Sequence, residues 1–276
     1  LLIGLVSTAI VAAVGENLGL GVSIYLYFLS AVILVLGILS LMFIPKFAGE
    51  IKTEGGFNLS EFTTAFRDPV VWIAAISLFF VYFYYTGVTY TTPYMTGVLG
   101  VSLAAATIVA NVRNYGITLL SGPIFGWIAN RFRPSVVIAI GSLVFIGALL
   151  VMMYLPTGPG VMVVACVLVV LLGFIANGAF GVVSAQLTEG KVPLTYFGAS
   201  IIGSLPDTFS STWFGAIMHA QTDAAGNVAP SAYQHIFWLL NGAALLAAVA
   251  SLGLYLYLRK TRPEVKADAG VEVAAV

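Results

Sequence analysis

The feature that most limits how this chain can fold is a succession of long apolar segments with almost no charge inside them. Only 8% of the residues are charged, whereas a soluble domain has about 25%. Segments of about 20 residues or more are long enough to cross a bilayer as helices. They cover residues 22–44, 70–95, 102–129, 134–155, 160–186, 193–219 and 231–258, and a shorter one covers 1–14. The sequence therefore predicts an all-α, polytopic membrane protein.

Basic residues occur in every second loop between these segments. Ten of the eleven follow this rule, and they are Lys46, Lys52, Arg67, Arg131, Arg133, Lys191, Arg259, Lys260, Arg262 and Lys266. An excess of Lys and Arg is typical of cytoplasmic loops. We therefore expect a multi-pass protein of the inner membrane whose C-terminus is cytoplasmic.

The alternation also divides the chain into four parts. We expect the end of one helical half at 1–45, a cytoplasmic loop at 46–69, a six-helix half at 70–260 and a disordered cytoplasmic tail at 261–276. In the loop, Leu59, Phe62 and Phe66 recur at helical spacing and predict a short helix on the membrane surface. Asp68 and Pro69 then have the residue types of a helix start, with Asp as the cap and Pro at the first position.

Two charges lie inside the apolar segments. Arg113 is eleven residues from the outer end of segment 102–129, and Asp207 is twelve residues from the outer end of segment 193–219. At a rise of 1.5 Å per residue, the two lie at nearly the same depth. A charge at the membrane centre costs at least ~2.5–3.5 kcal/mol, so each must face protein or water. We expect them to face each other or one shared cavity. The alternatives are a buried structural ion pair, or two charges that are each satisfied by their own neighbours.

Polar side chains accompany both charges at helical spacing. Ser200, Ser204 and Ser211 recur around Asp207, and Pro206 is expected to interrupt that helix, as in many ion and substrate sites. Helix–helix packing is the alternative reading of such stripes, above all in segment 160–186. The predicted substrate site consists of Arg113, Tyr82, Tyr85, Thr86, Thr89, Asn111, Asn114, Tyr115 and Asn177, with Asp207 and Ser204 as an ion pair or a proton-coupling site.

Other kinds of chemistry find little support in the sequence. His219 and His235 flank an outer loop and are isolated, and Cys166 lies within an apolar run. We therefore expect no catalytic residues, no metal site and no cofactor, and we do not expect an enzyme. The net charge is zero, so we expect no nucleic-acid partner.

The loop between segments 102–129 and 134–155 resembles a known signature. It reads Gly126-Trp-Ile-Ala-Asn130-Arg131-Phe-Arg133-Pro134 and is similar to the G-x-x-x-D-R-x-G-R-R motif of the major facilitator superfamily. Asn130 replaces the usual Asp, Arg133 the second Gly, and Pro134 an Arg. The long loop after the second segment and the six spans that follow it agree with helices five to twelve of such a transporter.

The resemblance implies roles for the segments. Segments 70–95 and 160–186 would line a central cavity, and 102–129 and 193–219 would face the other helical half. Gly126, Asn130 and Arg131 would belong to the cytoplasmic gate. Arg113 is also similar to the arginine by which the oxalate–formate antiporter branch binds a carboxylate substrate. That branch has a lysine on its eleventh helix, where this chain has Asp207.

Two functions of different classes follow. The first is secondary active transport of a small, anionic organic solute by alternating access, with Arg113 binding the anion. The second is a non-transporting membrane subunit that packs in or stabilises a larger complex. Its motive is that alternating access moves one helical half against another, and the expected segments make up only one complete half. The expected partners are a small solute, the lipid bilayer, and an N-terminal helical half or a partner chain that supplies it.

Overall fold

The computed structural model describes residues 18–43 and 67–261, apart from 157, 190–200 and 225. The chain separates into two units, Leu1–Asn58 and Leu59–Val276. Within the first, α2 (Leu18–Phe43) covers residues 22–43 of the predicted segment 22–44. The predicted segment 1–14, the surface helix at Leu59, Phe62 and Phe66, Lys46, Lys52, Lys191, Ser200, Arg262, Lys266 and most of the tail lie outside the described residues.

The second unit contains the six remaining predicted segments, and their ends agree to within a few residues where they are described. Its elements are α4 (Pro69–Gly87), η1 (Val88–Tyr90), α5 (Thr91–Gly97), α6 (Leu103–Asn111), η2 (Val112–Ile117), α7 (Thr118–Phe132), α8 (Pro134–Met153), α9 (Pro159–Val182), α10 (Ala185–Glu189), α11 (Ile201–Ala220) and α12 (Pro230–Thr261). The only β feature in this described part is an isolated bridge between Thr222 and Val228.

Four helical stretches in the second unit are long and apolar enough to cross a bilayer. They are Pro69–Gly97, Pro134–Met153, Gly160–Val182 and Pro230–Thr261. Large apolar side chains such as Ile140, Leu246 and Leu252 are about half exposed on the outside of their helices. Lipid is the solvent that suits such a surface. The chain is an all-α, polytopic membrane protein, as the sequence predicts.

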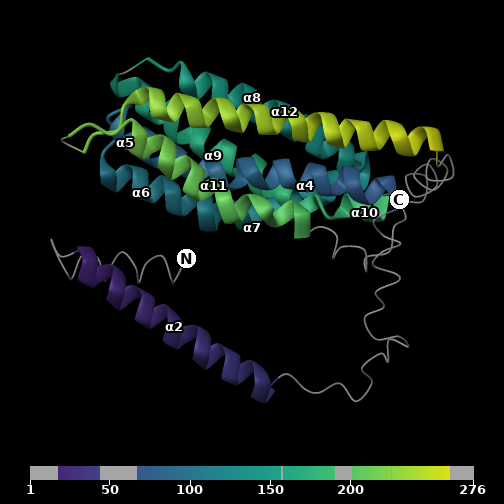
Figure 1. Ribbon diagram of the computed structural model, residues 1–276, viewed down its shortest axis with the longest axis horizontal. Coiled ribbons are helices and arrows are strands. Elements are labelled where there is room, and N and C mark those ends of the chain that lie inside the picture. Colours follow the sequence, from purple (N-terminus) through teal and green to yellow (C-terminus); the bar gives the residue numbers. More distant parts are fainter. Residues whose placement is uncertain (1–17, 44–66, 157, 190–200, 225, 262–276) are drawn as a thin grey trace. The chain divides into compact units, whose positions relative to one another are not determined.

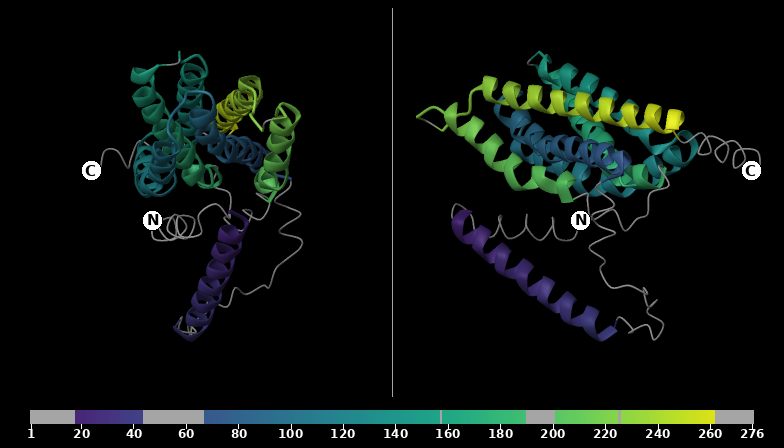
Figure 2. Two further views of the ribbon diagram at one scale, coloured as in Figure 1. Left: turned by 90° about the vertical axis from the view of Figure 1, so that its left-hand side faces the viewer. Right: turned by 45° about the vertical axis from the view of Figure 1, so that its right-hand side comes forward.

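Helix α4 has neighbours on several sides within the second unit. It packs against α11, α12 and α9, while α8 packs against α12 and α9, and α7 packs against α9 (Figure 1, Figure 2). The core between these helices includes Tyr84, Phe145 and Leu240, all fully buried. The Tyr84 and Phe145 rings lie 4.6 Å apart, and the Tyr84 hydroxyl is 3.3 Å from the Ser142 hydroxyl. This packing positions α4, which contributes the largest number of side chains to the site described below.

A chain of polar side chains joins four helices of this unit. The hydroxyls of Ser77 on α4 and Ser251 on α12 are 2.8 Å apart, and Gln186 Nε2 on α10 donates to Ser251 Oγ over 3.0 Å. Ser135 at the start of α8 donates to Glu189 Oε2 through its backbone N and its Oγ, over 3.0 and 2.6 Å. These bonds give buried polar groups the partners that an apolar surrounding cannot supply.

The predicted start of α4 is confirmed. Asp68 is the N-cap, its Oδ1 accepts a hydrogen bond from Val70 N over 2.9 Å, and Pro69 is the first helical residue. The substitution Asp68→Ala is expected to lower the free energy of unfolding by about 1 kcal/mol, because that N–H loses its acceptor. Thermal unfolding in detergent measures the effect. Asp68→Asn retains an acceptor and should unfold near the wild-type temperature, and equal losses in both variants would contradict the capping role.

Candidate functional site

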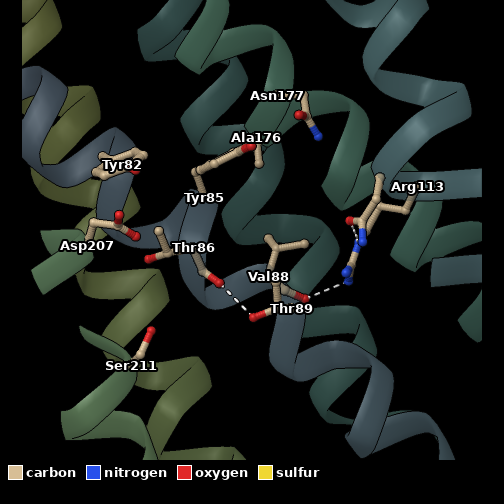
Figure 3. A pocket seen from close by; sticks show the side chains of 11 residues that line it. Tyr82, Tyr85, Thr86, Val88, Thr89, Arg113, Ala176, Asn177, Asp207 and Ser211 are labelled. Carbon is tan, nitrogen blue, oxygen red and sulfur yellow. Dashed lines mark hydrogen bonds between the residues drawn. The ribbon is translucent and has the colours of Figure 1, made fainter. Parts of the chain in front are cut away.

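A cavity of about 310 Å³ lies among α4, η1, η2, α9 and α11. This volume is at the lower end of the range typical of small-molecule sites. Most of its lining is polar, in a chain whose residues are 60% hydrophobic. The lining residues are Tyr82, Tyr85, Thr86, Val88, Thr89, Arg113, Asn114, Ala176, Asn177, Asp207 and Ser211 (Figure 3).

Arg113 is held in the cavity wall by hydrogen bonds to neutral groups. Its Nη1 donates to the Val88 carbonyl oxygen over 2.8 Å and to Thr91 Oγ1 over 2.9 Å, and its Nε donates to Asn114 Oδ1 over 3.1 Å. The side chain is only 3% exposed. Within the described ranges, no carboxylate forms an ion pair with it. The site therefore contains a buried cation whose charge is not balanced by a described acidic side chain.

The carbonyl that Arg113 binds belongs to a break in the helix that begins with α4. Residues Val88–Tyr90 form a 3₁₀ turn, in which the backbone N–H of Thr91 bonds to the Val88 carbonyl. Pro93 has no N–H to donate to the carbonyl four residues earlier, and in a regular helix its ring would clash with that carbonyl. The Thr91 hydroxyl also donates to the Val88 carbonyl over 2.6 Å. Such side-chain bonds compete with the regular helical pattern, so Pro93 and the threonines together account for the break.

Arg113 itself lies in a second irregular stretch. Residues Val112–Ile117 form a π-helix between α6 and α7. Single π-helical turns are rare in proteins as a whole, and those that occur are often at functional sites. The prediction of one regular helix over 102–129 is wrong at this point. The hydrogen bonds from Arg113 to η1 and α5 help to stabilise the wide turn, so the two irregular stretches support each other.

Gly173 on α9 provides the space through which the Arg113 side chain passes. A Cβ atom at Gly173 would overlap Arg113 Cγ and would lie 2.9 Å from Arg113 Cδ. Any larger residue there would have to displace the methylene groups that carry the guanidinium. Gly173 is therefore a positioning residue for Arg113, although it does not line the cavity.

Asp207 and Arg113 line the same cavity, as their equal depth predicts, but they do not form an ion pair. Figure 3 shows them on opposite sides, with Thr86, Val88 and Thr89 between them and Tyr82 beside Asp207. Asp207 is exposed to the cavity from α11. The predicted pairing is thus not formed here, and both side chains line the space between them.

The predicted break at Pro206 is wrong. Helix α11 is continuous from Ile201 to Ala220 and contains Pro206 within it. A proline removes one backbone hydrogen bond, and membrane helices tolerate that loss where neighbouring groups satisfy the freed carbonyl. The irregular backbone beside this cavity belongs to η1 and η2 instead.

Aromatic rings form one wall of the cavity. The ring centroids of Tyr82 and Tyr85 are 5.8 Å apart, and Phe180 on α9 stacks on both at 5.1 and 4.8 Å. Stacked rings resist rearrangement and present a flat surface of moderate polarity. This wall can contact the carbon skeleton of a small organic molecule while the charged groups bind its polar ends.

The structure brings together eight of the eleven residues predicted for the substrate and coupling sites. Asn111, Tyr115 and Ser204 do not line the cavity. Val88, Ala176 and Ser211 line it although they were not predicted as site residues, and the helical spacing of Ser211 from Asp207 is the one signal that points to any of them. Thr118 Oγ1 donates to Asn177 Oδ1 over 3.0 Å, so Asn177 also takes part in the packing of α9 against α7.

The residues of the signature-like loop lie at the end of α7. Gly126 is partly buried, whereas Asn130 and Arg131 are exposed. Arg133 joins α7 to α8 with a φ angle of 72° and places its guanidinium 5.7 Å from the centre of the Tyr255 ring. A gating role for Gly126, Asn130 and Arg131 remains a prediction from the resemblance.

Two curated proteins of Escherichia coli (strain K12) are similar to this chain. Inner membrane protein YihN is 24% identical over 263 residues, which cover 90% of this chain and 60% of YihN. Inner membrane protein YqcE is 29% identical over 228 residues, which cover 78% of this chain and 52% of YqcE. The chain thus spans between half and three-fifths of the length of these relatives. No protein-family model matches it, and no solved structure does. The similarity agrees with an inner-membrane location.

Proposed function

We propose that this chain forms part of a secondary active transporter of the major facilitator type, which moves a small organic anion across the inner membrane. The observation that carries the proposal is Arg113, a cation that is 3% exposed, lines a polar cavity and has no ion pair with a described carboxylate. A buried charge without a partner is unfavourable, and intramembrane charges commonly mark substrate paths. An anionic solute in the cavity would supply the missing partner.

The other lining residues support a specific arrangement of such a solute. The guanidinium would bind the anionic group by charge-assisted hydrogen bonds. Asn114, Asn177, Thr86 and Thr89 offer neutral donors and acceptors around it, and the rings of Tyr82 and Tyr85 would contact its carbon skeleton. Asp207, across the cavity from Arg113, would be the site of a coupling proton.

The major facilitator assignment rests on three observations. The second unit has the six long helical segments of one transporter half, the loop at Gly126–Pro134 resembles the family signature, and the similar proteins are inner membrane proteins longer than this chain. Alternating access requires a second helical half that moves against this one. The complete protein would provide it, either within one polypeptide or from a partner chain.

The alternative of a non-transporting subunit would not need a polar cavity of ligand size. The cavity at Arg113 therefore favours transport. The direct test is a counterflow assay with the complete protein, purified from its native membrane with any accompanying helices and reconstituted into proteoliposomes. Small carboxylates, phosphorylated compounds, amino acids, sugars and amines are screened. We expect anionic solutes to drive exchange, and exchange restricted to neutral or cationic solutes would contradict the proposal.

A further inference from the structure

A second cavity lies away from the polar site, on the outside of the helices. It is a groove of about 470 Å³ between α7, α8 and α9. Every residue that lines it is apolar, including Phe125 and Phe132 on α7, Ile140 and Val144 on α8, and Leu171 on α9. Phe132 and Ile140 are each 57% exposed, so the groove opens outward. Because this chain spans a membrane, hydrocarbon is the medium that reaches such a groove.

The length of the groove matches one leaflet of a bilayer. On α8 it extends from Val136, in the first turn of the helix, to Val144. Eight residues at 1.5 Å per residue give about 12 Å. The hydrocarbon core is about 30 Å thick, so one leaflet contributes about 15 Å. A single acyl chain that runs inward from the headgroup region would therefore fill the groove over nearly its whole length.

The end of the groove at the turn between α7 and α8 is positively charged. Arg131 is exposed and lies next to Phe132 and three residues after Ile128, both of which line the groove. The turn from Asn130 to Ser135 contains Arg131 and Arg133 and no acidic residue. Glu189, a carboxylate that contacts this turn, accepts hydrogen bonds from Ser135 N and Oγ.

Trp127 adds a further indication of where the membrane surface lies. Its side chain is 66% exposed and lies one helical turn before Arg131. Tryptophan is enriched where the hydrocarbon meets the headgroups. Trp127 and Arg131 thus lie in the same two turns of α7 as the groove residues Phe125, Ile128 and Phe132, so an interfacial ring and a cation are next to this end of the groove.

We propose that the groove between α7, α8 and α9 is a binding site for an anionic phospholipid. One acyl chain lies along Val136, Ile140 and Val144, and the phosphate lies against Arg131. The apolar groove supplies affinity for the chain, and Arg131 supplies the preference for an anionic headgroup. This site does not depend on the transport function, because neither its residues nor its ligand are shared with the polar cavity.

Native mass spectrometry of the complete protein, delipidated in detergent and titrated with phosphatidylglycerol or phosphatidylcholine, tests the site. We expect preferential retention of phosphatidylglycerol. Arg131→Gln should lower its occupancy about fivefold, the effect of roughly one surface cation on an anionic lipid, and should leave phosphatidylcholine unchanged. Ile140→Trp fills the groove and should lower the occupancy of both lipids.

Two matched variants serve as controls. Arg67→Gln removes another exposed basic residue, at the start of α4, and Leu246→Trp adds the same large ring at a position on α12 that is 47% exposed and outside the groove. Neither should change lipid occupancy. The proposal is overturned if Ile140→Trp behaves like Leu246→Trp, or if Arg131→Gln behaves like Arg67→Gln. It is also overturned if soluble glycerol phosphate displaces the lipid, since a bare phosphate site would not need the groove.

Discussion

Uptake by the complete protein is expected to fall about 10- to 100-fold when Arg113 is replaced by lysine, although the positive charge is kept. The guanidinium donates from Nη1 to Val88 and Thr91 and from Nε to Asn114 at the same time. A lysine ammonium is a single point donor on a flexible stem and cannot reproduce that fork. Losing one or two hydrogen bonds from a charged donor, at about 1.5 kcal/mol each, gives a loss of this size.

The variant Arg113→Gln should lose more, because it removes the charge that binds the anion. Initial rates of uptake into proteoliposomes measure both variants, and the amount of reconstituted protein normalises them. Arg259→Lys, at an exposed position in the last turn of α12, is the matched control and should transport normally. Wild-type uptake by Arg113→Gln would refute the assignment of Arg113 as the anion-binding group.

The second large effect is expected at Gly173, which does not touch the cavity. In Gly173→Ala the new methyl group would occupy the place of Arg113 Cγ, so the arginine must leave its bonds to Val88 and Thr91 or α9 must move away from η2. Overpacking of this kind typically costs about 1–3 kcal/mol. We expect a lower unfolding temperature in detergent and a loss of uptake comparable to that of Arg113→Lys.

Gly181→Ala is the control within the same helix. A Cβ atom at Gly181 would lie 3.8 Å from the Gly122 Cα, which is ordinary van der Waals contact. This variant should therefore transport and unfold like the wild-type protein. If Gly173→Ala also does so, the space for the arginine side chain is not limiting, and the described route of Arg113 past α9 would be incorrect.

The sequence predicts the membrane class, the helix ends and the shared depth of Arg113 and Asp207 because these depend on simple quantities. Segment length is set by bilayer thickness, and depth follows from the rise per residue. The start of α4 at Asp68 and Pro69 is equally local. Each of these predictions uses only residues that are neighbours in the sequence or counts along one helix.

The predictions that failed depend on a regular helix. Grouping Asn111 with Asn114 assumes 3.6 residues per turn, but the π-helix at Val112–Ile117 has a wider turn, so the faces before and after it no longer follow one line. Asn111 and Tyr115 therefore do not line the cavity. Pro206 suggested a break that α11 does not have, whereas the break at Val88–Tyr90 follows from Pro93 together with hydroxyl side chains.

The hydrogen bonds that Arg113 Nη1 donates connect two irregular backbone stretches, η1 and η2, in the cavity wall. The 3₁₀ turn at Val88–Tyr90 connects α4 to α5, and the hydrogen bond from Arg113 Nη1 to the Val88 carbonyl links the π-helix to that turn. A ligand that binds the guanidinium only through Nη2 would leave this hydrogen bond in place. A ligand that takes Nη1 would remove this bond and the one to the Thr91 hydroxyl, while Thr91 N and Oγ1 still donate to the Val88 carbonyl. The guanidinium nitrogen through which a ligand binds therefore determines whether the link between η2 and η1 is kept or lost.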